Sequence, residues 1–131
     1  MAIFSKQQQT TQETKATTII SQGAVIKGDL ELTAKLHIEG VVDGNIKSTN
    51  EVSIGKDGII KGDLKASKLI VNGTFEGTAE CDYIEIMKGG IIKGNITIKN
   101  ITIENGGCFA GTSSLKEDKN DTIKSTKTPK N

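Results

Sequence analysis

Most of this chain consists of six copies of one short unit, and this repeat limits the possible folds more than any other feature. Each unit contains an apolar-x-apolar pair, a short corner and then the pattern G-x-φ-x-G-x-φ-x-φ, in which φ is an apolar or small residue. The units read TIISQGAVIKGDLEL, LHIEGVVDGNIKS, VSIGKDGIIKGDLKA, LIVNGTFEGTAEC, IEIMKGGIIKGNITI and ITIENGGCFAGTSSL. A short unit that recurs in succession indicates a repeat architecture, in which each copy stacks on its neighbours.

The spacing of the repeat identifies its kind. One glycine recurs in every unit, at intervals of 15 to 18 residues, at Gly28, Gly44, Gly62, Gly77, Gly94 and Gly111. The second and fourth units are two residues shorter in the same corner, and the first unit has Ala24 where the others have a further glycine. Such a unit is too short for a propeller blade and contains no helix. It fits one coil of a parallel β-helix, with three strands of about four residues joined by tight, glycine-containing corners.

Apolar and polar residues alternate within each unit with a period of two, which is the pattern of half-buried strands. When the units are aligned, equivalent apolar residues form columns that we expect to stack as ladders inside the rod. The first three columns are Thr18, Leu36, Val52, Leu69, Ile84 and Ile101; Ile20, Ile38, Ile54, Val71, Ile86 and Ile103; and Ile26, Val42, Ile60, Phe75, Ile92 and Phe109. At about 4.8 Å per coil, six coils would form a rod roughly 30 Å long.

Polar segments flank the repeats. Residues 1–17 are rich in Gln and Thr, and residues 116–131 are charged and polar apart from Ile123. Neither segment can bury enough apolar surface to offset the entropy lost on ordering. We therefore predict an all-β, single-domain parallel β-helix of about six coils over residues 18–115, between two disordered tails.

Composition and motifs argue against several classes of function. All 17 basic residues are Lys and the formal charge is +1, so a nucleic-acid partner is poorly supported. No phosphate-binding loop follows a strand, so we expect no nucleotide. No apolar run spans a membrane and no signal peptide is evident, so we expect a cytoplasmic protein. Cys81 and Cys108 are too few for a disulfide framework, and we expect two buried or half-buried thiols.

An enzymatic β-helix has to be weighed against a structural one. His37 is the only histidine, and its place between two core positions puts it on the outer face with Glu39 two residues further along. A β-helix carbonic anhydrase needs three histidines for its zinc ion and is excluded. A hexapeptide-repeat acyltransferase needs one, so that alternative stays open for His37, although the corners here lack a strict six-residue repeat. Acidic residues beside the recurring glycine are mixed with lysines, which disfavours calcium or polysaccharide chemistry. We expect no catalytic residue, cofactor or metal.

The ends of the rod are more informative than its sides. A parallel β-helix leaves unpaired strand edges at both ends, and no amphipathic helix is present in the sequence to cap either one. Uncapped ends favour end-to-end stacking of identical subunits. Phe109 is the largest residue of the last coil and is placed to anchor such a contact; alternatively, it plugs the last core layer beneath the tail. The predicted polymer interface comprises Phe109, Cys108, Leu115, Ile19 and Ile20.

A short apolar tip precedes the polar N-terminal segment. It consists of Ile3 and Phe4, with Lys6 beside them. A few apolar side chains give one copy only marginal membrane affinity, but many copies along a polymer bind strongly by avidity. We predict that Ile3 and Phe4 bind a membrane, with an ordinary disordered start as the alternative.

The motifs of the coils resemble those of the bactofilin family. The chain begins MAIFSK and continues with T-x-I-x-x-G-x-x-I-K-G-D-L, H-I-E-G-x-V-D-G-x-I and further G-x-I-x-G-x-I coils, a resemblance that covers about residues 18–115. It implies a right-handed parallel β-helix between disordered tails. It also implies a bacterial cytoskeletal protein that polymerises end to end, without nucleotide, into apolar filaments.

The same resemblance implies partners and site residues. Ile3 and Phe4 fall where family members carry a short hydrophobic motif for the inner face of the cytoplasmic membrane, and Phe109 falls in the final coil, where the family has a phenylalanine important for polymerisation. Family members control cell shape by localising peptidoglycan-modifying enzymes, which implies cell-wall or membrane scaffold proteins as partners. Ala24 and the order of residues in the tip depart from the family pattern. A β-helix acyltransferase and a monomeric adaptor remain the alternative functions.

Overall fold

The computed structural model of the protein describes residues 17–116, which form ten β-strands. Their bounds are β1 (Thr17–Ile20), β2 (Val25–Leu32), β3 (Lys35–Ile38), β4 (Val41–Ser48), β5 (Glu51–Ile54), β6 (Ile59–Val71), β7 (Thr74–Ile86), β8 (Ile91–Ile98), β9 (Asn100–Ile103) and β10 (Cys108–Leu115). All ten belong to one sheet, every pairing in it is parallel, and no helix occurs in the described range.

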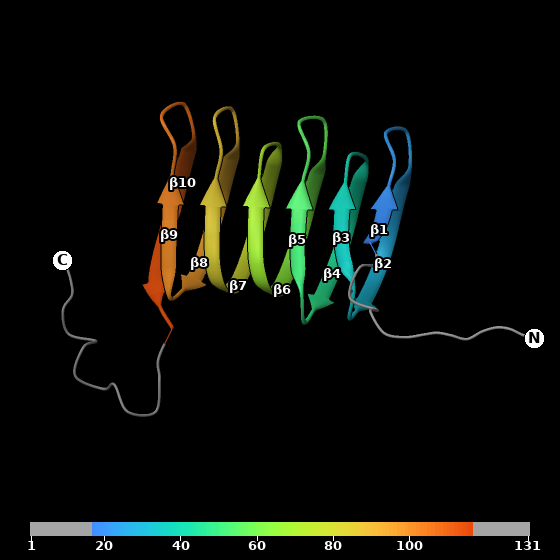
Figure 1. The fold of residues 1–131 in the computed structure, drawn as a ribbon, viewed down its shortest axis with the longest axis horizontal. Helices are drawn as coiled ribbons and strands as arrows, with labels where there is room; N and C mark the ends of the chain where they lie inside the picture. Colours follow the sequence, from blue (N-terminus) through green and yellow to red (C-terminus); the bar gives the residue numbers. More distant parts are fainter. Residues whose placement is uncertain (1–16, 117–131) are drawn as a thin grey trace, which may run out of the picture.

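The sheet winds into a rod of six coils, numbered here 1 to 6 from the N-terminal side. Coil 1 is formed by β1 and β2, coil 2 by β3 and β4, and coil 6 by β9 and β10. The 13-residue strands β6 and β7 each pass from one coil to the next, so that they complete coils 3 to 5 together with β5 and β8. In Figure 1 the front strands rise, the chain descends behind them and the coils advance from blue to red, which makes the helix right-handed. The predicted fold class is confirmed.

Equivalent positions of neighbouring coils pair in register along the rod. Phe75, for example, pairs with Ile60 in coil 3 and with Ile92 in coil 5. Coils 1, 3, 5 and 6 turn through four-residue corners, each closed by a hydrogen bond such as that from the Gly58 N–H to the Gly55 carbonyl oxygen over 2.9 Å. Coils 2 and 4 lack two of these residues. Because the difference is confined to one corner, it leaves the register of the strands unchanged.

The recurring glycine bends the longer strand segment of each coil into two legs. In all six coils its φ angle lies between +130° and +151°, a region that L side chains rarely adopt. The glycines also stack closely, since a Cβ atom on Gly62 would overlap the carbonyl oxygen of Gly44 in the coil before it. The structure therefore differs from the expected three separate strands per coil, because the two legs form one strand bent at the glycine, and in β6 and β7 this strand continues into the next coil.

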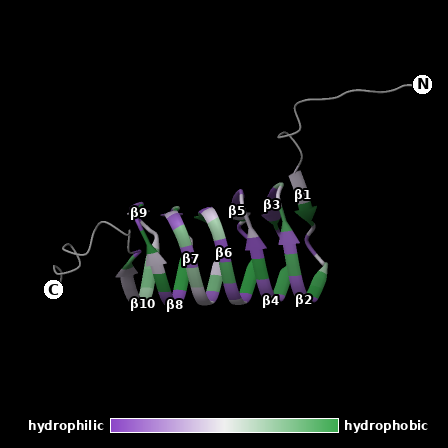
Figure 2. Cartoon of the chain, turned by 90° about the horizontal axis from the view of Figure 1, so that it is seen from below, coloured by the Kyte–Doolittle hydropathy of each residue, from purple (hydrophilic) through white to green (hydrophobic). Residues whose placement is uncertain are grey.

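The aligned apolar columns form the core. In coils 2 to 5, side chains from both neighbouring coils cover the inner positions, so residues such as Phe75, Ile60 and Ile92 are fully buried. Figure 2 shows hydrophobic and hydrophilic bands that recur from coil to coil along the rod. Ser48 is the one buried polar residue of the described range, and its Oγ accepts a hydrogen bond from the Asn50 N–H over 3.0 Å.

Candidate interface at the ends of the rod

The last coil exposes part of the core. Within residues 17–116, β9 pairs with β7 alone and β10 with β8 alone, so no strand lies beside the outer edge of coil 6. Ile103 and Leu115 are 46% and 58% exposed, whereas their equivalents in coil 5, Ile86 and Ile98, are buried. Apolar side chains and unpaired backbone groups thus share one surface. We call it the C-terminal end surface, made of Ile101, Ile103, Phe109 and Leu115.

Phe109 lies between the core and this open end. Phe75 occupies the same position in coil 4 and is 0% exposed, because Ile60 and Ile92 pack on its two sides. Phe109 pairs with Ile92 on one side and is half-buried against the core. No described residue continues the column on the other side. One side of Phe109 therefore closes the core, and no residue within 17–116 covers the other side.

The N-terminal end surface is formed by coil 1, whose strands pair only with those of coil 2 in the described range. Three of its inner residues, Ile26, Leu30 and Leu32, are half-buried and pack on the core. Ile20 lies in a core column and is buried. Ile19 is in register with His37 on the outer side of coil 1 and is exposed there, so it lies beside the end surface.

Coil 1 has Ala24 where the other five coils have a glycine, and the structure gives a physical reason for this difference. In coils 2 to 6 this position is a glycine, and at each one a Cβ atom would lie within 3.0 Å of an atom of the preceding coil. The nearest atom at Gly40, for instance, is the carbonyl oxygen of Ala24 itself. Coil 1 has no preceding coil in the described range, so the Ala24 methyl group has room. Alanine is therefore compatible with the end of a stack but not with its interior.

The two cysteines differ in accessibility. Cys81 lies in a core column, and burial raises the pKa of its thiol to about 12. Cys108 is exposed, which corrects the expectation that both thiols are at least half-buried. Its position points outward, and no coil follows coil 6 within residues 17–116. Cys108 thus lies beside Phe109 on the outer face of the predicted interface.

Lys116 ties the end of the described chain back to the rod. Its Nζ donates a hydrogen bond to Oδ1 of Asp82 over 2.7 Å, and its backbone N–H donates to the Ile98 carbonyl oxygen over 2.7 Å. The hydrogen bond with Lys116 lowers the pKa of Asp82, and the same contact raises the pKa of Lys116. Sequence reasoning missed this pair, because the two residues lie 34 positions apart. The separation of 34 residues equals two coils, and this spacing in the sequence could have identified the ion pair.

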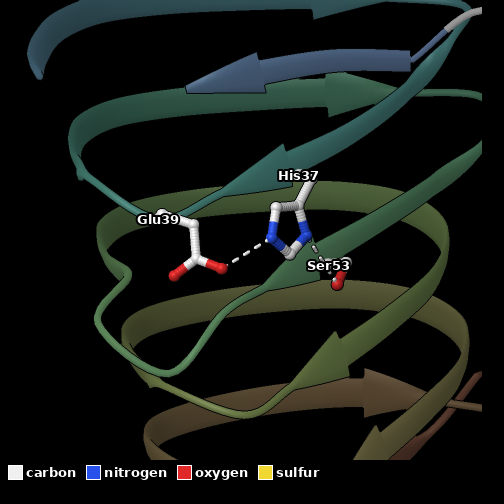
Figure 3. Close-up of polar contacts among 3 residues, drawn as sticks. All are labelled: His37, Glu39 and Ser53. Carbon is white, nitrogen blue, oxygen red and sulfur yellow. Dashed lines mark hydrogen bonds and ion pairs between the residues drawn. The ribbon is translucent and has the colours of Figure 1, made fainter. Parts of the chain in front are cut away.

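A polar cluster occupies the outer face of coils 2 and 3 (Figure 3). His37 Nε2 lies 2.8 Å from Glu39 Oε2, and His37 Nδ1 lies 3.2 Å from Ser53 Oγ. Because a carboxylate accepts only, a neutral imidazole here has to donate from Nε2 to Glu39 and to accept a hydrogen bond from the Ser53 hydroxyl group at Nδ1. Ser53 follows His37 by 16 residues, one coil, and is paired with it in register.

This Ser–His–Glu arrangement lacks the setting that acyl transfer needs. Stabilising an acyl-transfer intermediate requires N–H donors aimed at the developing oxyanion. Ser53 lies within β5, whose backbone pairs with β3 on one side and β6 on the other, so the surrounding N–H groups belong to the sheet. The cluster links coils 2 and 3 on the surface.

The other sequence-derived candidates lie elsewhere. A shallow hollow of about 450 Å³ opens on the second-leg face of coils 1 to 4, and Asp29, Asp63 and Lys47 are among its lining residues. It does not include His37. Within residues 17–116 no group of three His, Cys, Asp or Glu side chains could hold a metal ion, and no helix is long and apolar enough to cross a membrane. Ile3 and Phe4 lie outside the described residues.

Comparison with known proteins connects this architecture to one family. Residues 18–114 match the family model described as "Bactofilin: Polymer-forming cytoskeletal". Among solved structures, the chain is similar to a bactofilin of Thermus thermophilus reconstructed by cryo-EM as double helical filaments. That match has a TM-score of 0.68 at 17% sequence identity, and covers 76% of this chain and 99% of the other. None of the curated proteins matches the chain.

Proposed function

Because this chain belongs to the bactofilin family of polymer-forming cytoskeletal proteins, we propose that its β-helices join end to end, without nucleotide, into apolar filaments. One observation carries this proposal: unpaired strand edges and exposed apolar side chains lie together on the C-terminal end surface. Leu115, Ile103 and the open side of Phe109 all lie on that surface. An edge of this kind is a template for another strand.

Apolar contacts supply the driving force in this proposal. Covering Phe109, Ile103 and Leu115 removes their apolar surface from water, at roughly 25 cal/mol per Å². Pairing of the edge strands satisfies backbone N–H and C=O groups at the same time. Both contributions come from the protein itself, which supports assembly without nucleotide.

Ala24 supports the apolar arrangement of subunits. In a polar filament, coil 6 of one subunit would take the place of a preceding coil next to coil 1 of another. If such a joint continued the β-helix without a break, the Ala24 methyl group would meet a neighbour as close as the one that requires glycine at Gly40. When like ends meet, the filament has no such joint, and strands at each junction run antiparallel.

We further propose that the filaments lie at the inner face of the cytoplasmic membrane and localise peptidoglycan-modifying enzymes. Membership of the family supports the cytoskeletal role, and the apolar residues Ile3 and Phe4 support the membrane contact. In cells lacking the protein, we expect altered cell shape together with dispersed incorporation of a labelled cell-wall precursor. Normal shape and incorporation would contradict the scaffolding role while leaving filament formation in place.

Negative-stain electron microscopy of the purified full chain tests assembly directly. We expect filaments in buffer that contains no nucleotide, with no change in their number or length when ATP or GTP is added. Class averages should show two kinds of junction that alternate along the filament, each with two-fold symmetry, rather than a single repeating junction. A monodisperse monomer at every protein concentration would contradict the proposal and favour the monomeric adaptor.

A further inference from the structure

One outward position is apolar in five of the six coils, where strand alternation predicts a polar residue. It is the first residue of the first leg, directly after the corner. The members of this outer apolar column are Val25, Val41, Ile59, Thr74, Ile91 and Cys108, and they pair in register from coil to coil. Val25 is 60% exposed, and the others are half-buried or exposed. The column thus forms an apolar line along the outside of the rod that is interrupted only at Thr74.

A second column lies beside it on the same face, two residues further along each strand. Its charges alternate in sign from coil to coil and end at an alanine: Lys27, Asp43, Lys61, Glu76, Lys93 and Ala110. None of these charges takes part in an ion pair. The two ion pairs found in residues 17–116 are His37–Glu39 and Lys116–Asp82, both on other parts of the surface. The alternating charges are therefore available to a partner.

We propose that this face, the first-leg face, binds the same face of a second copy of the chain side by side, with the two rods antiparallel. In the proposed contact, coil 1 of one rod lies opposite coil 6 of the other, coil 2 opposite coil 5, and coil 3 opposite coil 4. A two-fold axis in the plane of the contact relates the copies. Each column then meets its own counterpart, as an isologous interface requires.

The order of charges selects this register. It places Asp43 opposite Lys93 of the second copy and Lys61 opposite Glu76 of the second copy, while Lys27 faces an alanine. A shift by one coil would bring Lys27 against Lys93 and Asp43 against Glu76. A parallel contact with matched columns would bring each charge against itself. Juxtaposed like charges disfavour both alternatives.

The outer apolar column supplies the contact that the charges orient. In the same register Val41 lies opposite Ile91 of the second copy, and Ile59 lies opposite Thr74. Burial of this line removes apolar surface from water. The core contains none of these side chains, and only Cys108 is shared with the predicted polymer interface, so the side contact can be tested separately from end-to-end assembly.

Opposite charges in neighbouring coils also attract within one chain, so the test has to separate the two effects. Asp43 and Lys93 make this possible. Three coils separate them in one rod, about 14 Å at about 4.8 Å per coil, which is too far for a zero-length cross-link. The antiparallel register brings them together between two rods. An Asp43–Lys93 link is therefore specific to the proposed contact.

The experiment uses full-length protein, with equal amounts of unlabelled and ¹⁵N-labelled chains mixed before assembly. The mixture is treated with a carbodiimide, and linked peptides are identified by mass spectrometry. We expect an Asp43–Lys93 link in which about half of the products join a labelled to an unlabelled chain. The link between Lys61 and Glu76, which are neighbours in one chain, serves as the reaction control. Absence of the Asp43–Lys93 link while the control forms, or its formation only within one isotope, would overturn the proposal.

A pair of variants tests the apolar column. Val41→Thr with Ile59→Thr keeps β-branched residues on the strands and removes apolar surface from the first-leg face. We expect the yield of the mixed Asp43–Lys93 link to fall at least tenfold, with an unchanged circular dichroism spectrum. Ile70→Thr is the control, because Ile70 is also half-buried and points outward. It lies on a different face of the rod, beside Ser53 of β5. Equal yields from the double variant and the control would contradict the role of the column.

Discussion

The Nζ atom of Lys116 lies 2.7 Å from Oδ1 of Asp82, two coils earlier in the rod. Both side chains are partly exposed, so the pair contributes only about 0.2–1 kcal/mol to the free energy of unfolding. The lowered pKa of Asp82 means that this contribution is present above the ordinary carboxyl pKa and is lost as pH falls through the lowered value. The raised pKa of Lys116 means that it is also lost at strongly alkaline pH.

We expect Asp82→Asn to lower stability slightly at pH 7 in low salt and to have no effect at pH 2. Urea unfolding followed by circular dichroism measures both. Asp57→Asn, at an exposed corner, is the control and should have no effect at either pH. An equal loss of stability at pH 2 and pH 7 would contradict the contribution of the ion pair.

Replacing Phe109 with arginine should shorten the filaments. The substitution removes an aromatic contact from each junction and introduces a charge where the proposed partner offers apolar side chains and strand edges. A loss of about 1.4 kcal/mol raises the critical concentration about tenfold. Analytical ultracentrifugation should show short or monomeric species with nearly unchanged circular dichroism, whereas Phe109→Leu should retain assembly. Wild-type filament length in Phe109→Arg would rule out the interface.

A comparison of Gly62→Ala with Gly28→Ala separates the two reasons why this column requires glycine, namely the positive φ angle and the close approach of the preceding coil. Both residues have φ near +130°, so alanine is strained at either position, by about 1–3 kcal/mol. Only at Gly62 would the new Cβ atom also overlap the backbone of a preceding coil, because nothing lies within 4 Å of that site at Gly28. Thermal unfolding should show a clearly larger decrease for Gly62→Ala. Equal decreases would mean that crowding between coils contributes little.

The two thiols should react at very different rates. Cys108 is exposed, whereas Cys81 is buried and has a pKa raised to about 12, so its reactive thiolate is scarce at neutral pH. A thiol reagent at pH 8 should modify one cysteine per folded chain under conditions that block assembly, and two after unfolding in urea. Modification in a Cys108→Ser variant before unfolding would contradict the burial of Cys81.

Deletion of residues 1–6 should release the protein from liposomes without preventing assembly. Ile3 and Phe4 provide the apolar side chains of the tip, whereas the proposed end-to-end contacts are made by coils 1 and 6. Co-sedimentation with vesicles measures attachment, and electron microscopy of the same sample measures assembly. A control that replaces Gln7, Gln8 and Gln9 with serine should sediment like the wild type. Unchanged sedimentation of the deletion would exclude the tip as the membrane contact.

The coils, the core and their register could be predicted from the pattern of residues alone. A period of two identified the inner residues of each strand, and the recurring glycine aligned one coil with the next, so that Phe75 could be placed between Ile60 and Ile92. This worked because stacked coils repeat the same backbone environment. Each column therefore carries the same requirement for an apolar side chain or for a glycine.

The contacts of the outer and terminal side chains, by contrast, became clear only from the folded structure. The column alignment places Ser53 beside His37, but whether they bond depends on side-chain rotamers and on the room beside Glu39. The reach of Lys116 across two coils to Asp82 likewise follows from its extended side chain. Exposure of Cys108 and tolerance of Ala24 depend on whether another coil lies next to them. An inner column repeats its environment in every coil, whereas a side chain at the surface or at an end meets neighbours that occur only once.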